Sequence, residues 1–157
     1  MQRRVVEHLG ASARCGRAPD PLFVEEAMVR LLSRAARAST SGLPARGARV
    51  RDDHRALADA CRARLAERLD EPLPLTALAR SLGVSPYHLA RVFRRECGAT
   101  LHATRNSLRL RTALERVSAG DDLARVAVDL GFASHSHFTA LFRRAFGVTP
   151  SRFRAGS

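Results

Sequence analysis

Residues 75–101 read LTALARSLGVSPYHLARVFRRECGATL, and residues 123–150 read LARVAVDLGFASHSHFTALFRRAFGVTP. The two stretches carry one pattern: apolar positions of the first recur 48 residues later, as Gly83 and Gly131 show. After these glycines the offset is 49 residues, as Phe93 and Phe142 show, so one residue has been added in the turn. An internal repeat of this length indicates a supersecondary unit used in duplicate. Two copies are too few for a solenoid, so we interpret the repeat as a paired module.

Each copy is predicted to form a helix-turn-helix. Apolar residues at positions i, i+3, i+4 and i+7 indicate the first helix of copy one, namely Leu75, Leu78, Ala79 and Leu82. Gly83 and Gly131 are expected to end the first helices, because glycine adopts the left-handed cap conformation without steric cost. Ser85, which precedes Pro86, and Ser134 are expected to cap the second helices, since a serine oxygen can accept an unpaired backbone N–H.

The second helix of each copy has one apolar face and one polar, basic face. The residues expected inside are Leu89, Val92, Phe93, Cys97, Phe138, Leu141, Phe142 and Phe146. A short glycine turn before a helix with a polar N-terminal half and a basic flank is the geometry that lays a recognition helix in a DNA major groove. The alternative is a helical hairpin that serves only packing, but duplication with arginines at matched positions favours DNA binding.

The charge of the chain is strongly positive. Lys+Arg is 27, all of them arginine, against 15 acids, and the formal net charge is +12. Residues 72–157 hold 13 arginines and five acids, so the repeat region carries +8. Positive charge on a helical module indicates a polyanionic partner, because contacts to phosphate release counterions. A GC-rich coding bias would explain arginine in place of lysine, but not the excess of base over acid.

The remaining composition favours a soluble protein of the cytoplasm. No stretch approaches the roughly 18 apolar residues of a membrane span. The first nine residues contain arginines but no apolar segment typical of a secretion signal. Cys15, Cys61 and Cys97 are odd in number and widely spaced, which indicates reduced thiols. We therefore expect a cytoplasmic protein that associates with the nucleoid.

Further helical segments surround the repeat. Residues 101–119 predict a continuous helix that spaces the two recognition helices, and Gly120 ends it. Four arginines are expected on the outer faces of this helix: Arg105, Arg109, Arg111 and Arg116. Residues 52–70 predict a helix that closes the first copy into a three-helix bundle, and residues 38–50 predict a linker. Residues 22–36 predict an amphipathic helix with no obvious packing partner, so we expect it to be removable without loss of DNA binding.

The chain resembles the C-terminal DNA-binding domain of the AraC/XylS family of bacterial transcription regulators, over about residues 53–154. The most specific matching residues are Leu130 to Phe138, Phe142 to Pro150, and Phe153-Arg154. The first copy matches at Leu78-Ala79, Gly83-Val84-Ser85, His88-Leu89, Arg91-Val92-Phe93 and Gly98. The resemblance implies an all-α fold with two helix-turn-helix subdomains, at about 75–97 and 123–146, joined by a long linker helix. It also implies a domain at 51–157 and an N-terminal appendage and linker at 1–50.

The chain departs from the family pattern at particular positions. Leu101 and Thr104 stand where the family usually has proline and tyrosine, so we expect a looser start of the linker helix. Ala90 and Ala140 stand at positions expected to face outward, where the family often carries base-reading polar side chains, which predicts fewer direct base contacts. The first 50 residues are too few for the sensing domain of full-length members. The resemblance therefore implies a truncated regulator, or a short form that binds DNA without sensing.

The outward residues of the second helices are the candidate DNA contacts. The candidate base-reading residues are Tyr87, His88, Arg91, His135, Ser136 and Thr139. Arg91 is suited to contact guanine, because its planar guanidinium group can donate two hydrogen bonds to the O6 and N7 acceptors. The methyl group of Thr139 is suited to contact thymine. The candidate phosphate-binding residues are Ser85, Arg94, Arg95, Ser134, Arg143 and Arg144. A solvated helix face is the alternative for the arginine pairs.

No catalytic residue, cofactor or metal is expected. His135 and His137 are two residues apart, so they cannot face one metal ion from a helix. One DNA-repair branch of the family carries a zinc-holding alkyl-acceptor domain, for which three scattered cysteines cannot supply the ligands. The expected partners are double-stranded DNA and RNA polymerase, with no membrane, and this form is expected to be a monomer. The alternative is an interaction module or decoy that binds a partner protein through residues 22–36 and has only non-specific DNA affinity.

Overall fold

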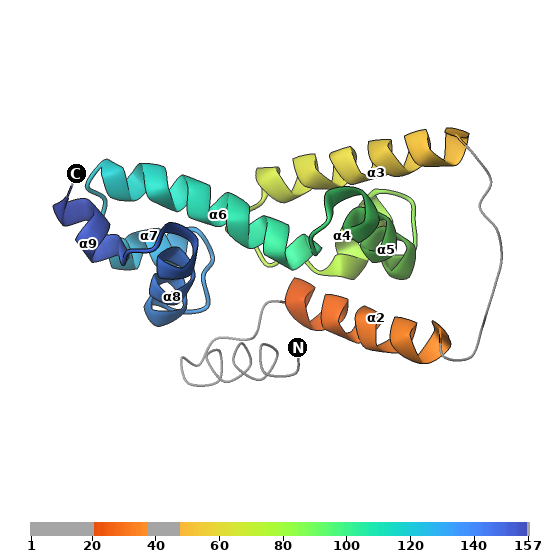
Figure 1. Cartoon of the computed structure of the whole chain (residues 1–157), viewed down its shortest axis with the longest axis horizontal. Coiled ribbons are helices and arrows are strands. Elements are labelled where there is room, and N and C mark those ends of the chain that lie inside the picture. The colour runs from red at the N-terminus through yellow and green to blue at the C-terminus, as the bar shows by residue number, and fades with distance from the viewer. Residues whose placement is uncertain (1–20, 38–47, 157) are drawn as a thin grey trace. The chain divides into compact units, whose positions relative to one another are not determined.

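The computed structural model describes residues 21–37 and 48–156, and every regular element within these ranges is an α-helix (Figure 1). The predicted all-α class is therefore confirmed. The helices are α2 (Pro21–Arg37), α3 (Ala48–Glu67), α4 (Leu75–Ser81), α5 (Pro86–Cys97), α6 (Leu101–Ser118), α7 (Leu123–Asp129), α8 (His135–Phe146) and α9 (Pro150–Ala155). None of these described helices is long and apolar enough to cross a membrane. Cys15 and most of the predicted linker, residues 38–47, lie outside the described residues.

The described helices form two compact units. The N-terminal unit comprises Pro21–Arg68 and Leu73–Thr104, and the C-terminal unit comprises Leu69–Pro72 and residues 105–156. Each unit contains one predicted helix-turn-helix: α4 with α5 in the first, and α7 with α8 in the second. The helix predicted over residues 52–70 begins earlier, at the start of α3, so the end of the predicted linker is helical. Alanine and arginine, which begin α3, are strong helix formers.

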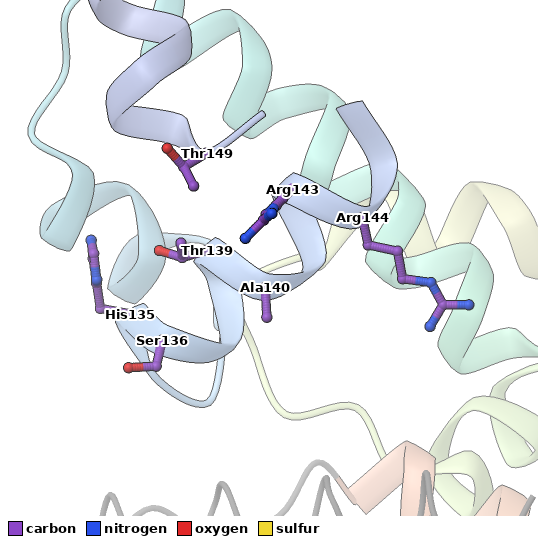
Figure 2. Close-up of a pocket in the computed structure, with 7 residues that line it drawn as sticks. All are labelled: His135, Ser136, Thr139, Ala140, Arg143, Arg144 and Thr149. Atoms are coloured by element: carbon purple, nitrogen blue, oxygen red, sulfur yellow. The ribbon is translucent and has the colours of Figure 1, made fainter. Parts of the chain in front are cut away.

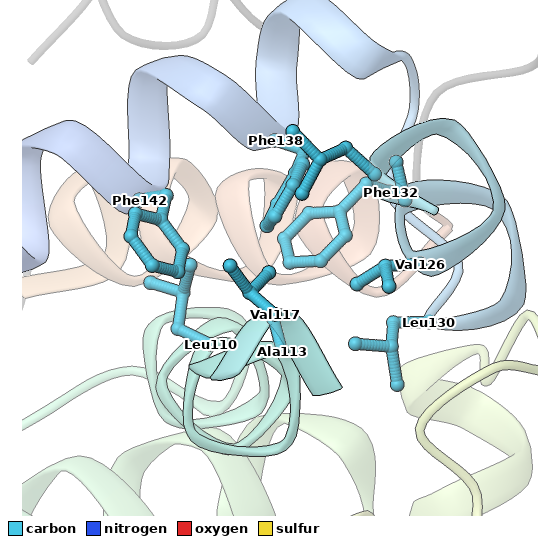
Figure 3. Close-up of a cluster of buried hydrophobic side chains, with 10 residues drawn as sticks. Leu110, Ala113, Val117, Val126, Leu130, Phe132, Phe138 and Phe142 are labelled. Atoms are coloured by element: carbon cyan, nitrogen blue, oxygen red, sulfur yellow. The ribbon is translucent and has the colours of Figure 1, made fainter. Parts of the chain in front are cut away.

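Aromatic and aliphatic side chains of α6, α7, α8 and the turn between α7 and α8 form the core of the C-terminal unit (Figure 3). Its buried members are Leu110, Ala113, Val117, Leu123, Val126, Ala127, Leu130, Phe132, Phe138 and Phe142. The ring centroid of Phe138 lies 5.0 Å from that of Phe132 and 5.6 Å from that of Phe142. Leu141 and Phe146 are partly buried against this core, as predicted. The core thus fixes which face of α8 points outward.

Helix α5 lies at the centre of the N-terminal unit, where it contacts α2, α3 and α4. Its predicted inward residues Leu89, Val92 and Phe93 are buried, and Cys97 is half-buried. The prediction that Ala90 faces outward is wrong, because this side chain is only 7% exposed. Contact with three helices widens the buried face of α5 beyond the stripe that one neighbour would need.

Helix α2 packs on the N-terminal unit, although the sequence offers it no obvious partner. It contacts α4 and α5, and its Leu22 is fully buried. Glu25 Oε2 accepts a hydrogen bond from the backbone N of Thr76 in α4 at 2.8 Å. Glu26 accepts hydrogen bonds from the backbone N of Leu101 and of His102 in α6 at 2.9 and 3.0 Å. The expectation of an unpacked appendage is therefore wrong.

The two carboxylates satisfy helix starts that have few other partners. The first four N–H groups of a helix have no partner within the helix. The N-cap of α4 is Pro74, which makes no side-chain cap hydrogen bond. At the start of α6, Thr100 Oγ1 accepts a hydrogen bond from the backbone N of Ala103 at 3.1 Å, beside the two that Glu26 accepts. Leu101 is also fully buried, so the looser start expected for this helix is not what the structure shows.

Two arginines of α6 are buried, although their spacing predicts outer faces. Arg105 is 0% exposed and Arg109 is 4% exposed. Arg105 donates a hydrogen bond to the carbonyl of Glu71, and Arg109 Nε donates one to the carbonyl of Leu69 at 2.8 Å. A buried guanidinium has several donors that need acceptors, and these backbone carbonyls supply them. The predicted exposure holds for Arg111, which faces solvent.

Candidate nucleic-acid interface

The two second helices share their length, their serine cap and their glycine end. Both α5 and α8 have 12 residues. Ser85 Oγ accepts a hydrogen bond from the backbone N of His88 at 3.2 Å, and Ser134 Oγ accepts one from that of His137 at 3.0 Å. A glycine in the left-handed conformation, Gly98 or Gly147, ends each helix. The predicted serine caps are confirmed, and each hydroxyl hydrogen remains available as a donor.

The turns before these helices also match. The backbone N of Val84 donates to the carbonyl of Ala79, and that of Phe132 donates to the carbonyl of Ala127, both at 3.0 Å. Such a hydrogen bond, made by the residue after a left-handed glycine, satisfies a carbonyl in the last turn of the helix. The residue added in the second copy lies in this turn, and Phe132 places its ring in the core, 1% exposed. We call α4 with α5 the first head and α7 with α8 the second head.

The first head presents a cation and an aromatic ring together. Tyr87 is 41% exposed, and the guanidinium carbon of Arg91 lies 5.9 Å from the centroid of its ring. His88 is half-buried, with its ring centroid 5.6 Å from that of His54 in α3. Burial lowers the pKa of His88, and the nearby Arg91 and His54 lower it further. The imidazole is thus neutral near physiological pH and offers one donor and one acceptor.

The second head has an open hollow of about 690 Å³ on its outward face (Figure 2). The hollow is lined by His135, Ser136, Thr139, Ala140, Arg143, Arg144 and Thr149. All three base-reading candidates of this head and both arginines among its phosphate-binding candidates therefore meet at one surface. Unlike Ala90, Ala140 is exposed, as predicted.

Thr149 is the polar lining residue that the candidate residues omit. Its Oγ1 caps α9 by accepting a hydrogen bond from the backbone N of Arg152 at 3.4 Å. The repeat supplies a signal for it, because Thr100 stands at the equivalent position of the first copy and caps α6 in the same way. A threonine at this place in both copies therefore marks a helix start at the end of each head.

The exposed charge of α5 and α8 is mostly positive. Arg94 and Arg95 of α5 and the equivalent Arg143 and Arg144 of α8 are all exposed. Helix α8 contains no acidic residue, and α5 contains one, Glu96. Within the described residues, no group of three or more histidines, cysteines or acids is placed to hold a metal ion. The arrangement can bind a polyanion and present hydrogen-bonding side chains to it.

Comparison with known proteins identifies the family. The model of a helix-turn-helix domain family matches residues 78–156, which is half of the chain. SoxS of Escherichia coli K12, a regulatory protein, is 35% identical over 89 residues, which cover 56% of this chain and 83% of SoxS. The chain belongs to the AraC/XylS family of regulators.

Other members are similar over the same region. The transcriptional regulator GlxA of Rhizobium meliloti is 38% identical over 90 residues, which cover 57% of this chain but only 28% of GlxA. An AraC-type regulator from Chromobacterium violaceum has a TM-score of 0.61 at 25% identity, covering 66% of this chain and 94% of that one. The DNA-binding domain of AdpA, solved with a target DNA, has a TM-score of 0.58 at 26% identity, covering 63% of this chain and 90% of that domain.

Proposed function

We propose that the chain is a sequence-specific DNA-binding transcription regulator that places α5 and α8 in successive major grooves of one duplex. The observation that carries this proposal is the duplicated recognition helix, with the same cap, the same end and the same exposed arginine pair. Arginine pairs at equivalent positions of the two helices can contact the regularly spaced phosphates of DNA. The similarity to AdpA, whose domain was solved with a target DNA, supports it.

The outward residues of the two heads divide into two roles. The arginine pairs, together with the hydroxyls of Ser85 and Ser134, bind phosphate and set the register of the protein on the duplex. The six base-reading candidates, three on each head, face the base edges. We propose Arg91 as the main guanine contact, since it is exposed and its guanidinium carbon lies 5.9 Å from the ring centroid of Tyr87, another base-reading candidate.

We also propose a protein partner and a cellular location for this regulator. A regulator that acts on transcription meets RNA polymerase at the promoter, and it works in the cytoplasm at the nucleoid. Two heads in one chain let a monomer occupy a full site. The relatives are transcription regulators, so we propose no enzymatic role. The partner-binding alternative is not favoured, because α2 uses Leu22, Glu25 and Glu26 for contacts inside its own unit.

Arg91→Ala and Arg143→Ala separate the two roles. We expect Arg91→Ala to lose about 1–3 kcal/mol of discrimination between the selected site and random DNA, since it removes a base contact. Arg143→Ala should weaken binding to all sequences alike, since it removes a phosphate contact. Gel-shift titrations with a selected duplex and with random DNA measure both. The control is Arg64→Ala, which removes an exposed arginine of α3 paired with Glu67 at 3.6 Å. Equal losses on both duplexes for Arg91→Ala would remove Arg91 from the base-reading set.

A further inference from the structure

The two heads can be compared position by position. Because α5 and α8 have equal length, the same serine cap and the same glycine end, residue n of α5 corresponds to residue n + 49 of α8. The phosphate-binding arginines correspond at this offset: Arg94 with Arg143, and Arg95 with Arg144. The two helices therefore carry equivalent anchors to the DNA backbone, and differences between the heads lie in the residues that face the bases.

The largest difference falls at the best base-reading position. Ala140 corresponds to Arg91, so the second head presents a methyl group where the first presents a guanidinium. The preceding residue also differs, since Thr139 lines the hollow whereas its counterpart Ala90 is 7% exposed. Figure 2 shows Thr139 and Ala140 at the middle of the lining, with His135 and Ser136 at one end of α8 and the two arginines at the other.

The chemistry of this surface restricts what it can read. Ala140 has no side-chain donor or acceptor, so it cannot contact the O6 and N7 of guanine. The apolar group on a base edge in the major groove is the 5-methyl of thymine, which alanine and the threonine methyl contact. The hollow is open and about 690 Å³ in volume, so a base edge can approach the two methyl groups while Arg143 and Arg144 reach the flanking phosphates.

We propose that the second head recognises the 5-methyl group of thymine through the methyl groups of Thr139 and Ala140. The DNA site bound by one chain then differs between its two halves, because each head prefers a different base pair. It requires a G·C pair under Arg91 and an A·T pair under Ala140. This inference rests on the proposed function, and it adds the base class that each head prefers.

Deoxyuridine tests the proposal directly, because it differs from thymidine only by the 5-methyl group. The preferred duplex is first selected with the full chain from a random pool. Each thymidine of that duplex is then replaced singly by deoxyuridine, and the affinity is measured by gel shift. We expect one replacement to weaken binding about fourfold, which corresponds to the burial of about one methyl group. Replacements elsewhere should change the affinity little.

Three variants assign the sensitive thymidine to the second head. Ala140→Gly should reduce the difference between thymidine and deoxyuridine, since one of the two contacting methyl groups is gone and only that of Thr139 remains. Ala140→Arg gives the second head the side chain of the first, so repeated selection should shift its preferred pair from A·T to G·C. It also keeps a strong helix former at the position, which covers the case in which glycine unfolds α8. The control Arg91→Ala lies in the other head and should keep the deoxyuridine effect.

The outcomes separate the inference from the proposed function. A sharp selected sequence with no deoxyuridine effect at any position overturns the thymine contact and leaves the proposed function intact. A deoxyuridine effect that Ala140→Gly and Ala140→Arg both leave undiminished overturns the assignment to the second head. A pool that yields no preferred sequence at all overturns the proposed function itself.

Discussion

Gly131 and Gly83 occupy the same turn position in the two heads, with φ of +70° and +67°, yet their surroundings differ. A Cβ built on Gly131 would lie 2.7 Å from the carbonyl oxygen of Asp70 and 2.8 Å from Arg109 Nη2. A Cβ on Gly83 would meet nothing within 4 Å. The segment before α4 thus passes against the turn of the second head, and only a hydrogen fits between them.

Alanine at the two glycines should therefore have unequal effects. Gly83→Ala is expected to cost about 1–2 kcal/mol, the strain of a left-handed residue that has a Cβ. Gly131→Ala should cost clearly more, because Asp70 is met through its backbone and Arg109 is held by the carbonyl of Leu69. Urea unfolding followed by helical circular dichroism gives both free energies. Equal losses would mean that residue 70 can move away freely.

The sequence indicates the conformation of these glycines but not the neighbour of Gly131. A left-handed helix end follows from the local pattern, so both turns were predictable. The close approach of Asp70 depends on a contact between residues 61 positions apart. The burial of Arg105 and Arg109 escaped prediction for the same reason, since their acceptors lie in a segment far away in the chain.

Among the elements, α2 is the one whose role changes most between sequence and structure. The bounds of α4, α5, α7 and α8 follow from caps and apolar spacing, which are local signals. The docking of α2 depends on Glu25 and Glu26, whose partners are 51 and 75 positions away. An adjacent pair of acids is ordinary on an exposed helix face, so the sequence gives no reason to predict caps for two other helices.

Glu26→Ala tests whether α2 stabilises the N-terminal unit. Two backbone N–H groups at the start of α6 would lose their acceptor, and an unsatisfied buried group costs about 1–3 kcal/mol. We expect a loss of about 2 kcal/mol or more in the free energy of unfolding. Met28→Ala, at a side chain of the same helix that is 57% exposed, is the control and should cost little. In the wild-type protein, the backbone amides of α2 should exchange their hydrogens slowly. Exchange as fast as in an isolated peptide would show that α2 does not dock.

The contribution of Glu26 to the free energy of unfolding should depend on pH in a definite direction. Burial raises the pKa of Glu26 above its ordinary value of 4.5, although its hydrogen bonds to His102 and Leu101 oppose the shift. The unfolded chain thus releases this proton at lower pH than the folded chain does. The contribution of Glu26 to stability is full below the ordinary value and decreases as the pH rises through the raised one. Relative to Glu26→Gln, which cannot titrate, the wild type should therefore be less stable near neutral pH than near pH about 4.

At the scale of the whole molecule, the repeat gives one chain two candidate DNA-binding surfaces. Two recognition helices reach successive major grooves on one face of a duplex when they lie about 34 Å apart, one helical turn. A monomer should then protect a non-palindromic site of about two turns. Footprinting, combined with titration of protein against a short duplex, measures the protected length and the number of chains bound. A palindromic footprint that requires two chains would mean that dimerisation, and not the second head, supplies the reach.

The salt dependence of binding tests the phosphate contacts that we propose for both heads. Each phosphate neutralised by an arginine contributes about −0.9 to the slope of log affinity against log salt, because a condensed counterion is released. Arg94, Arg95, Arg143 and Arg144 are exposed at equivalent positions of the two heads. If both heads bind at once, Arg94→Ala and Arg143→Ala should each reduce the slope by about one, and the double variant by about two. Fluorescence anisotropy between about 50 and 200 mM salt measures these slopes. A slope that responds to Arg94→Ala but not to Arg143→Ala would place the second head away from the backbone, and the footprint of one chain should then shrink to about one turn.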